Sequence, residues 1–117
     1  MDMRAQILAA DDLPKEKASA PEWGVEEIFL RVMTSAEREK YESGVFKADG
    51  SEQLDHGILR ARLVAFTAVD SGGVRIFSDE DIPALSGKSS QVLMRLARVA
   101  QRMNGLGAAA EEETAKK

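Results

Sequence analysis

The sequence predicts a small α+β domain that is predominantly helical, with about three to five helices, one N-terminal strand and one short strand after a glycine turn. Three observations support this class. Residues 89–103 repeat apolar side chains at helical spacing. Residues 25–33 form a shorter run rich in β-branched and aromatic residues. A chain of 117 residues has the size of one domain. We expect a single globular domain over residues 1–107 and a flexible charged tail over residues 108–117.

The N-terminal third is expected to combine a helical turn with a strand. Residues 3–10 favour a short helical turn, which ends before Pro14 because a residue that precedes proline is disfavoured in the helical conformation. The polar stretch 15–24 is interpreted as a loop or an edge strand. Residues 25–33 fit both a helical stripe and β-alternation, and their short length and Val, Ile and Phe content favour a strand.

Trp23, the single tryptophan, lies two residues before this strand. The chain has only one Tyr and four Phe besides it, so it is not part of an aromatic cluster. A lone tryptophan in so small a set of large rings is typical of a core anchor. We therefore expect Trp23 to pack at the end of the strand and to set the approach to the helix that follows.

The helix after the strand has a clear start signal. Thr34 and Glu37 form a T-x-x-E capping box, in which each side chain binds an amide of the first turn. This helix should begin at about residue 35, end at residue 43 or 45, and lie on the surface. Residues 47–55 are expected to form a loop with a turn at Asp49-Gly50.

The middle of the chain predicts a buried helix that begins at His56. It is apolar nearly all round, as expected of a helix at the centre of a domain. The pattern leaves residues 62–69 open between helix and strand. A glycine turn then leads to a short strand at 74–77, and Ser78 caps an acidic turn in which Pro83 limits any regular helix.

The strongest helix prediction covers residues 89–103. Asn104-Gly105 supplies the left-handed stop after it. The apolar stripe consists of Val92, Leu93, Leu96, Val99, Ala100 and Met103.

Charge and composition exclude several functions. The net charge is -4 and there is no cysteine, so a dedicated nucleic-acid binder, a disulfide framework and a thiol nucleophile are disfavoured. Arg95, Arg98 and Arg102 are spaced as a basic helix face, which we interpret as solvated; a small regulator that uses this face on nucleic acid is the less favoured alternative. No apolar run approaches the roughly 20 residues that cross a bilayer.

The sequence contains no recognisable catalytic or metal-binding constellation. His56 is the single histidine and has no neighbouring ligand or nucleophile in the pattern of a site. Residues 70–81 have the length of a calcium loop, but Arg75 replaces the required glycine. We therefore predict a protein that is not an enzyme and has no cofactor and no metal.

The serial order of several short motifs resembles the tail assembly chaperones of long-tailed (siphovirus-type) bacteriophages. The similarity extends over residues 1 to about 107, and the order of the motifs is more specific than any one of them. They are, in order, "PEWG", "RVMTSAERE", "RARLVAFTAVD", "RIFSDEDIPALSGKS" and "VAQRMNGL".

The resemblance implies a protein of the bacterial host cytoplasm that acts during infection. Such chaperones bind the tape measure protein, keep it soluble, help to recruit major tail tube protein, and are absent from the mature virion. Family genes often also encode a longer product by frameshifting, and Lys116-Lys117 is compatible with a slippery adenine run. The alternative is a structural tail or head-tail component that is retained in the virion.

Two residues are candidates for contact with the partner. Met94 lies off the apolar stripe of residues 89–103, on the side of Arg98 and Gln101, and a flexible, exposed methionine suits an adaptable binding surface. Leu106 follows the helix stop. For each residue, the alternative is packing against the rest of the domain.

Overall fold

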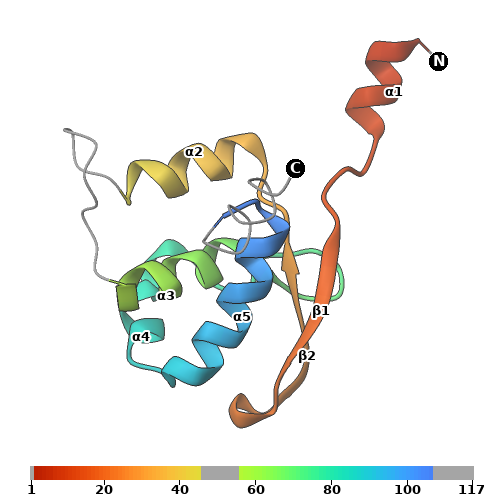
Figure 1. The fold of residues 1–117 in the computed structure, drawn as a ribbon. Helices are drawn as coiled ribbons and strands as arrows, with labels where there is room; N and C mark the ends of the chain where they lie inside the picture. The colour runs from red at the N-terminus through yellow and green to blue at the C-terminus, as the bar shows by residue number, and fades with distance from the viewer. Residues whose placement is uncertain (1, 46–55, 107–117) are drawn as a thin grey trace, which may run out of the picture.

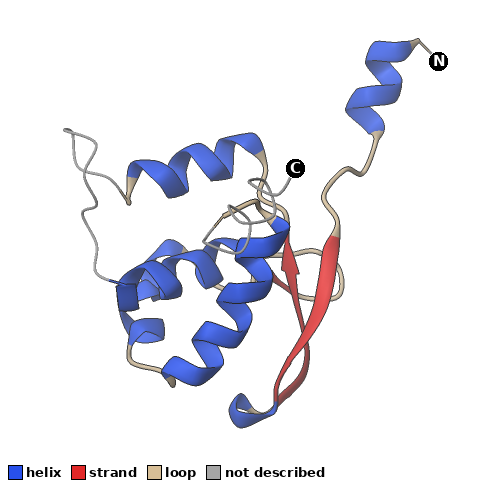
Figure 2. Cartoon of the chain, viewed as in Figure 1, coloured by secondary structure: helices blue, strands red, loops and turns tan. Residues whose placement is uncertain are grey.

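A computed structural model describes residues 2–45 and 56–106 and shows a three-stranded antiparallel sheet beside a group of helices (Figure 1). The sheet lies on one side and most of the helices on the other (Figure 2), which confirms the α+β class. In chain order the elements are α1 (Met3–Ala9), β1 (Lys15–Ala20), the 3-10 turn η1 (Pro21–Trp23), β2 (Val25–Arg31), α2 (Ser35–Ser43), α3 (His56–Thr67), β3 (Ala68–Val69), η2 (Asp79–Asp81), α4 (Ile82–Ser86) and α5 (Ser90–Met103).

The N-terminal part of the sheet is a hairpin of two strands, where the sequence predicted one. β1 pairs with β2 from Lys15↔Arg31 to Ala18↔Ile28, and the register then shifts before Ala20. The stretch interpreted as a loop or an edge strand is therefore an edge strand, followed by η1. Ile28 and Leu30 of β2 point into the core and are almost fully buried.

The third strand differs in position from the prediction. Residues 68–69 form β3 before the glycine turn, and the predicted strand at 74–77 is reduced to one bridge between Val69 and Arg75. The Arg75 guanidinium donates to the Ala65 carbonyl at 2.8 and 3.1 Å, which holds this segment against the end of α3 instead of in the sheet. The sequence left residues 62–69 open between helix and strand. In the structure the helix continues to Thr67, and the last two residues form a strand.

The predicted helix boundaries are confirmed at their caps. Both halves of the Thr34–Glu37 capping box are present, and Ser89 accepts a hydrogen bond from the Val92 amide at the start of α5. Gly105 takes the left-handed conformation after α5, with φ of 66°. Pro83 falls in the first turn of α4, where a helix needs no amide donor, so the acidic turn continues into a five-residue helix.

The core surrounds α3, as predicted for a helix that is apolar nearly all round. α3 packs against α4 and α5 and also contacts β2 and α2. Phe66 is 1% exposed, and the side chain of Tyr41 from α2 meets its ring edge-on at 5.7 Å between centroids. The largest fully buried side chains are Phe66, Leu30, Leu63, Leu96, Val64, Val69, Val92 and Thr67.

Trp23 is a structural anchor, but not for the helix that was expected. It is half-buried in η1 and packs against the core at the turn between β1 and β2. Thr34 and α2 follow the opposite end of β2. The prediction that Trp23 sets the approach to α2 is therefore wrong, because Trp23 closes the hairpin instead.

Several predictions lie outside the described residues. These are the loop at 47–55 with its turn at Asp49-Gly50, the tail at 108–117 and the domain boundary at 107.

Candidate partner-binding surface

Helix α5 has one face in the core and one face toward the surface. The buried side chains are Val92, Leu93, Leu96, Ala97 and Ala100. Val99 and Met103, which the predicted stripe also contained, are partly buried and pack against the core. The remaining face carries Met94 and the arginines Arg95, Arg98 and Arg102. The candidate partner contact and the candidate nucleic-acid contact of α5 therefore lie on the same surface.

Met94 is half-buried. It is not one of the partly buried apolar side chains that pack against the core within the described ranges. Arg98, one turn further, is exposed, and Gln101 is half-buried. Met94 thus lies beside polar neighbours, off the apolar stripe, and is half-buried where the sequence predicted an exposed side chain.

Leu106 has a different environment. Its side chain is partly buried and packs against the core, and its amide donates to the Gln101 carbonyl at 2.7 Å. Leu106 therefore contributes to the packing of the domain as well as presenting an accessible part of its side chain.

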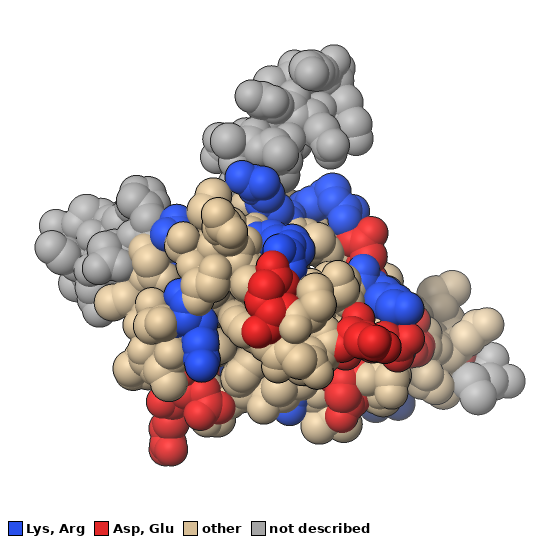
Figure 3. All heavy atoms as spheres, turned by 90° about the horizontal axis from the view of Figure 1, so that it is seen from below, with Lys and Arg blue, Asp and Glu red and all other residues tan. Residues whose placement is uncertain are grey.

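The basic face of α5 is largely neutralised by carboxylates of the hairpin. Arg95 forms a two-point ion pair with Glu22 of η1, with N–O distances of 2.9 and 2.6 Å. Arg102 pairs with Glu16 of β1. Arg98 pairs with no described residue. Figure 3 shows acidic and basic side chains interleaved on the face seen from below, and this pairing favours a structural role for the arginines over phosphate binding.

The ion pair changes the titration of Glu22. The hydrogen bond from Arg95 is the main cause that lowers the pKa of Glu22 from 4.5 to about 2, and the backbone of Glu22 itself adds to the effect. The same contact raises the pKa of Arg95. The pair therefore remains charged through the physiological range and ties α5 to the hairpin.

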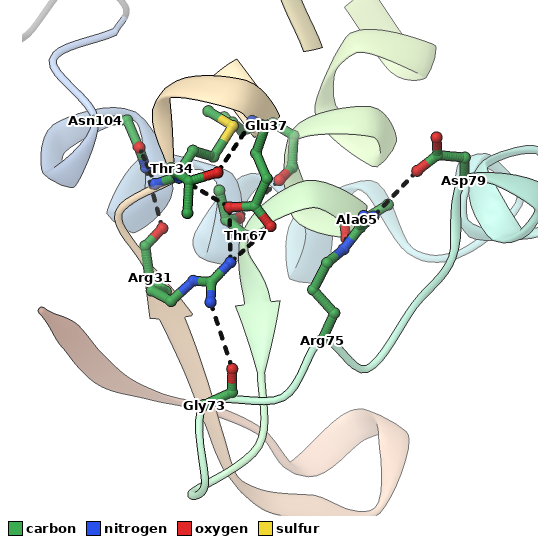
Figure 4. Close-up of polar contacts among 11 residues, drawn as sticks. Arg31, Thr34, Glu37, Ala65, Thr67, Gly73, Arg75, Asp79 and Asn104 are labelled. Carbon is green, nitrogen blue, oxygen red and sulfur yellow. Dashed lines mark hydrogen bonds and ion pairs between the residues drawn. The ribbon is translucent and has the colours of Figure 1, made fainter. Parts of the chain in front are cut away.

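A polar junction joins the end of α5 to the start of α2 (Figure 4). Arg31 donates to both carboxylate oxygens of Glu37 at 2.7 Å. The side chain of Asn104 binds the backbone of Met33, and Arg38 donates to the Asn104 carbonyl at 2.9 Å. These contacts hold the segment that leads to Leu106 in a fixed position against β2.

Sequence reasoning missed one exposed apolar surface, on α1. Met3, Ile7 and Leu8 are 75%, 64% and 69% exposed, and α1 has no buried residue. Figure 1 shows this helix projecting from the rest of the molecule. The spacing of Met3, Ile7 and Leu8 is visible in the sequence, but this spacing does not indicate whether the rest of the domain covers the three side chains.

The geometry offers no metal centre or membrane span within the described ranges. No group of three or more His, Cys, Asp or Glu side chains there is placed to hold a metal ion. None of the described helices is long and apolar enough to cross a membrane. His56 begins α3, and its side chain lies outside the description. A polar cavity of about 180 Å³ is lined by Asp11, Leu13, Lys15, Arg31, Gly72 and Gly73.

Comparison with known proteins identifies a related fold. No protein-family model matches the sequence, and no curated protein matches it. Among solved structures, the chain is similar to the bacteriophage HK97 tail assembly chaperone, with a TM-score of 0.61 and 16% sequence identity. The match covers 90% of this chain and 96% of that chain. The chain therefore has a fold like that of a phage tail assembly chaperone.

Proposed function

We propose that this protein is a tail assembly chaperone of a long-tailed bacteriophage, which binds the tape measure protein and keeps it soluble during tail assembly. The observation that carries the proposal is the similarity to the HK97 tail assembly chaperone over nearly the whole length of both chains. The order of the sequence motifs supports the same role independently of the structure.

The proposed mechanism is reversible binding without a catalytic step. A long client helix with an apolar stripe aggregates through that stripe, and a chaperone that covers it keeps the client in solution. Met94 and Leu106 are the proposed contacts from the body of the domain. Met94 supplies a flexible apolar side chain that adapts to different helix surfaces.

The proposed setting is the cytoplasm of the infected bacterium. The protein would act there on the tape measure protein, help to recruit the major tail tube protein, and leave before the virion is complete. A longer, frameshifted form of the chain is a further proposed partner. We propose no contact with nucleic acid or membrane.

Co-expression with the tape measure protein of the same phage tests the proposal. We expect the tape measure protein to move into the soluble fraction and to co-purify with the tagged chain. A matched culture that expresses the tape measure protein alone should leave it in the pellet. A client that stays insoluble and unbound beside a folded, soluble chain contradicts the chaperone function.

Virion composition separates this function from the alternative of a retained tail or head-tail component. Mass spectrometry of purified virions should find the tape measure protein and not this chain. A fixed number of copies in each particle would support the structural component instead.

A further inference from the structure

Helix α1 is separated from the packed body of the protein. It spans seven residues, buries no side chain, and is joined to β1 by the segment 10–14, which forms no helix or strand. Asp2 caps it by accepting a hydrogen bond from the Ala5 amide at 2.8 Å. Three of the six exposed large apolar side chains of the described residues lie on this one short helix.

A helix of this length needs a partner. Isolated helices shorter than about 12–15 residues are marginally stable in water because nucleation is costly. In soluble proteins, most helical stability comes from packing of an apolar face. The described residues of this chain do not provide that packing, so the apolar face of α1 needs a contact surface that they do not supply.

The exposed face of α1 indicates the chemistry of that molecule. At 3.6 residues per turn, Met3, Ile7 and Leu8 fall within about 140° of arc. Arg4 lies inside the same arc, is exposed, and pairs with no described residue. A complementary surface must therefore be apolar and must place a carboxylate close to the apolar stripe.

We propose that α1 is a docking arm that packs against an amphipathic helix of the tape measure protein, with a client carboxylate paired to Arg4. This inference rests on the proposed function and names a second contact surface for it. Met3, Ile7 and Leu8 supply the apolar contact, and Arg4 fixes which side of the client helix they cover.

A second copy of this chain is a poorer occupant. Outside α1, the exposed large apolar side chains of the described residues are Val25 on β2 and Val74 and Ile76 in the segment after β3. They do not form a helical stripe. A helix about 10 Å long also cannot bury the roughly 800 Å² per partner typical of a stable dimer.

A lipid surface is disfavoured by charge. Asp2, Asp11 and Asp12 flank α1 on both sides and are exposed. Anionic lipid head groups repel such carboxylates.

The apolar contact is tested with the double variant Ile7→Ser/Leu8→Ser. The control is Val74→Ser/Ile76→Ser, which also removes two exposed apolar side chains but lies outside α1. Both are co-expressed with the tape measure protein, and the client retained per chain is measured. We expect about a tenfold loss for the α1 variant, since each side chain forfeits part of its burial on the client. The control should retain the wild-type amount.

The charge contact is tested with Arg4→Glu against Lys88→Glu, because both side chains are exposed and pair with no described residue, and Lys88 precedes α5, away from Met94. We expect Arg4→Glu to lower retention, Arg4→Lys to restore most of it, and Lys88→Glu to leave it unchanged. Equal retention by both Glu variants, together with full retention by the Ile7/Leu8 variant, would overturn the docking arm.

Three further measurements separate the docking arm from the alternative explanations. If wild-type chain retains no client, the proposed function itself fails, whatever α1 does. If the Ile7/Leu8 variant changes the mass of the purified chain in light scattering, α1 binds a second copy and the client assignment is wrong. If that variant abolishes sedimentation with vesicles of phosphatidylglycerol and phosphatidylethanolamine, the partner is a membrane.

Discussion

Asn104 connects the end of α5 to the backbone of Met33, 71 residues earlier in the chain. Its Oδ1 accepts a hydrogen bond from the Met33 amide at 2.8 Å, and its Nδ2 donates to the Arg31 carbonyl at 3.3 Å. Arg38 of α2 donates to the Asn104 carbonyl at 2.9 Å. One residue just beyond α5 therefore positions both the end of β2 and the start of α2.

The substitution Asn104→Ala should destabilise the domain by about 1–3 kcal/mol, the usual cost of leaving a partly buried polar group unsatisfied. The Met33 amide would lose its acceptor, and the end of β2 would lose its tie to α5. Urea denaturation monitored by circular dichroism measures the change. Gln101→Ala, on the last turn of the same helix, is the control and should stay within about 0.5 kcal/mol of wild type. Equal unfolding midpoints for the two variants would show that the junction is not held by Asn104.

The ion pair between Glu22 and Arg95 should make stability depend on pH in a defined window. The folded pKa of Glu22 is about 2, below its ordinary 4.5, so between these values the unfolded chain binds more protons at this site. The stabilisation is fully present above about pH 4.5 and is lost as the pH falls toward 2. Denaturation of wild type and Glu22→Gln should therefore differ most at neutral pH and converge near pH 2.

Two controls make the pH test specific. Glu26→Gln removes an exposed carboxylate of β2 that pairs with no described residue, and it should show no such convergence. Added salt should reduce the difference between wild type and Glu22→Gln, because both partners of the pair are exposed. A constant difference from pH 7 to pH 2 would mean that the Glu22 side chain acts through packing.

Gly44 makes room for the side chain that caps α2. The Arg62 guanidinium donates to the Tyr41 and Lys40 carbonyls at 3.1 and 2.8 Å, and a Cβ at Gly44 would overlap that guanidinium. Gly44 has an ordinary φ of -87°, so only this close approach opposes a larger residue. The guanidinium is the far end of a flexible side chain and can move aside, so Gly44→Ala should cost about 0.5–1.5 kcal/mol, the net contribution of the hydrogen bonding that Arg62 would lose.

A double-mutant cycle identifies the cause. In the background Arg62→Met, Gly44→Ala should be neutral or stabilise by about 0.4–1 kcal/mol, because alanine restricts the unfolded chain. The free energies of unfolding of the four proteins give the coupling directly. The same cost in both backgrounds would rule out the Arg62 contact as the reason for glycine at this position.

Features that depend on neighbours in the sequence were predictable. The Thr34–Glu37 capping box and the apolar stripe of α5 depend on spacings of three or four residues, which the sequence displays. The strand at 68–69 was not distinguishable from helix, because a short buried apolar run has no clear period. Its pairing with β2 decides the conformation.

Features that depend on distant residues were not predictable. Glu22 and Arg95 are 73 positions apart, so the neutralised basic face of α5 appears only in the fold. Met3, Ile7 and Leu8 have an amphipathic spacing, but their exposure follows from the absence of any packing partner in the described body. The sequence identified Met94 and Leu106 as candidate partner contacts but could not show which of them is the better candidate. They differ in their contacts, because Leu106 packs against the core and Met94 does not.

Substitution of Met94 and Leu106 should separate binding from stability. Met94→Ser should cost about 0.5–1 kcal/mol, less than Leu106→Ser, because the side chain is half-buried but does not pack against the core. Leu106→Ser should cost about 1 kcal/mol or more, since it removes apolar atoms that pack against the core. Both should lower the amount of tape measure protein that co-purifies with the chain. Gln101→Ser, half-buried on the same helix face as Met94, is the control for retention. Wild-type retention by a folded Met94→Ser variant would remove Met94 from the client surface and leave Leu106 and α1 as the remaining candidate contacts.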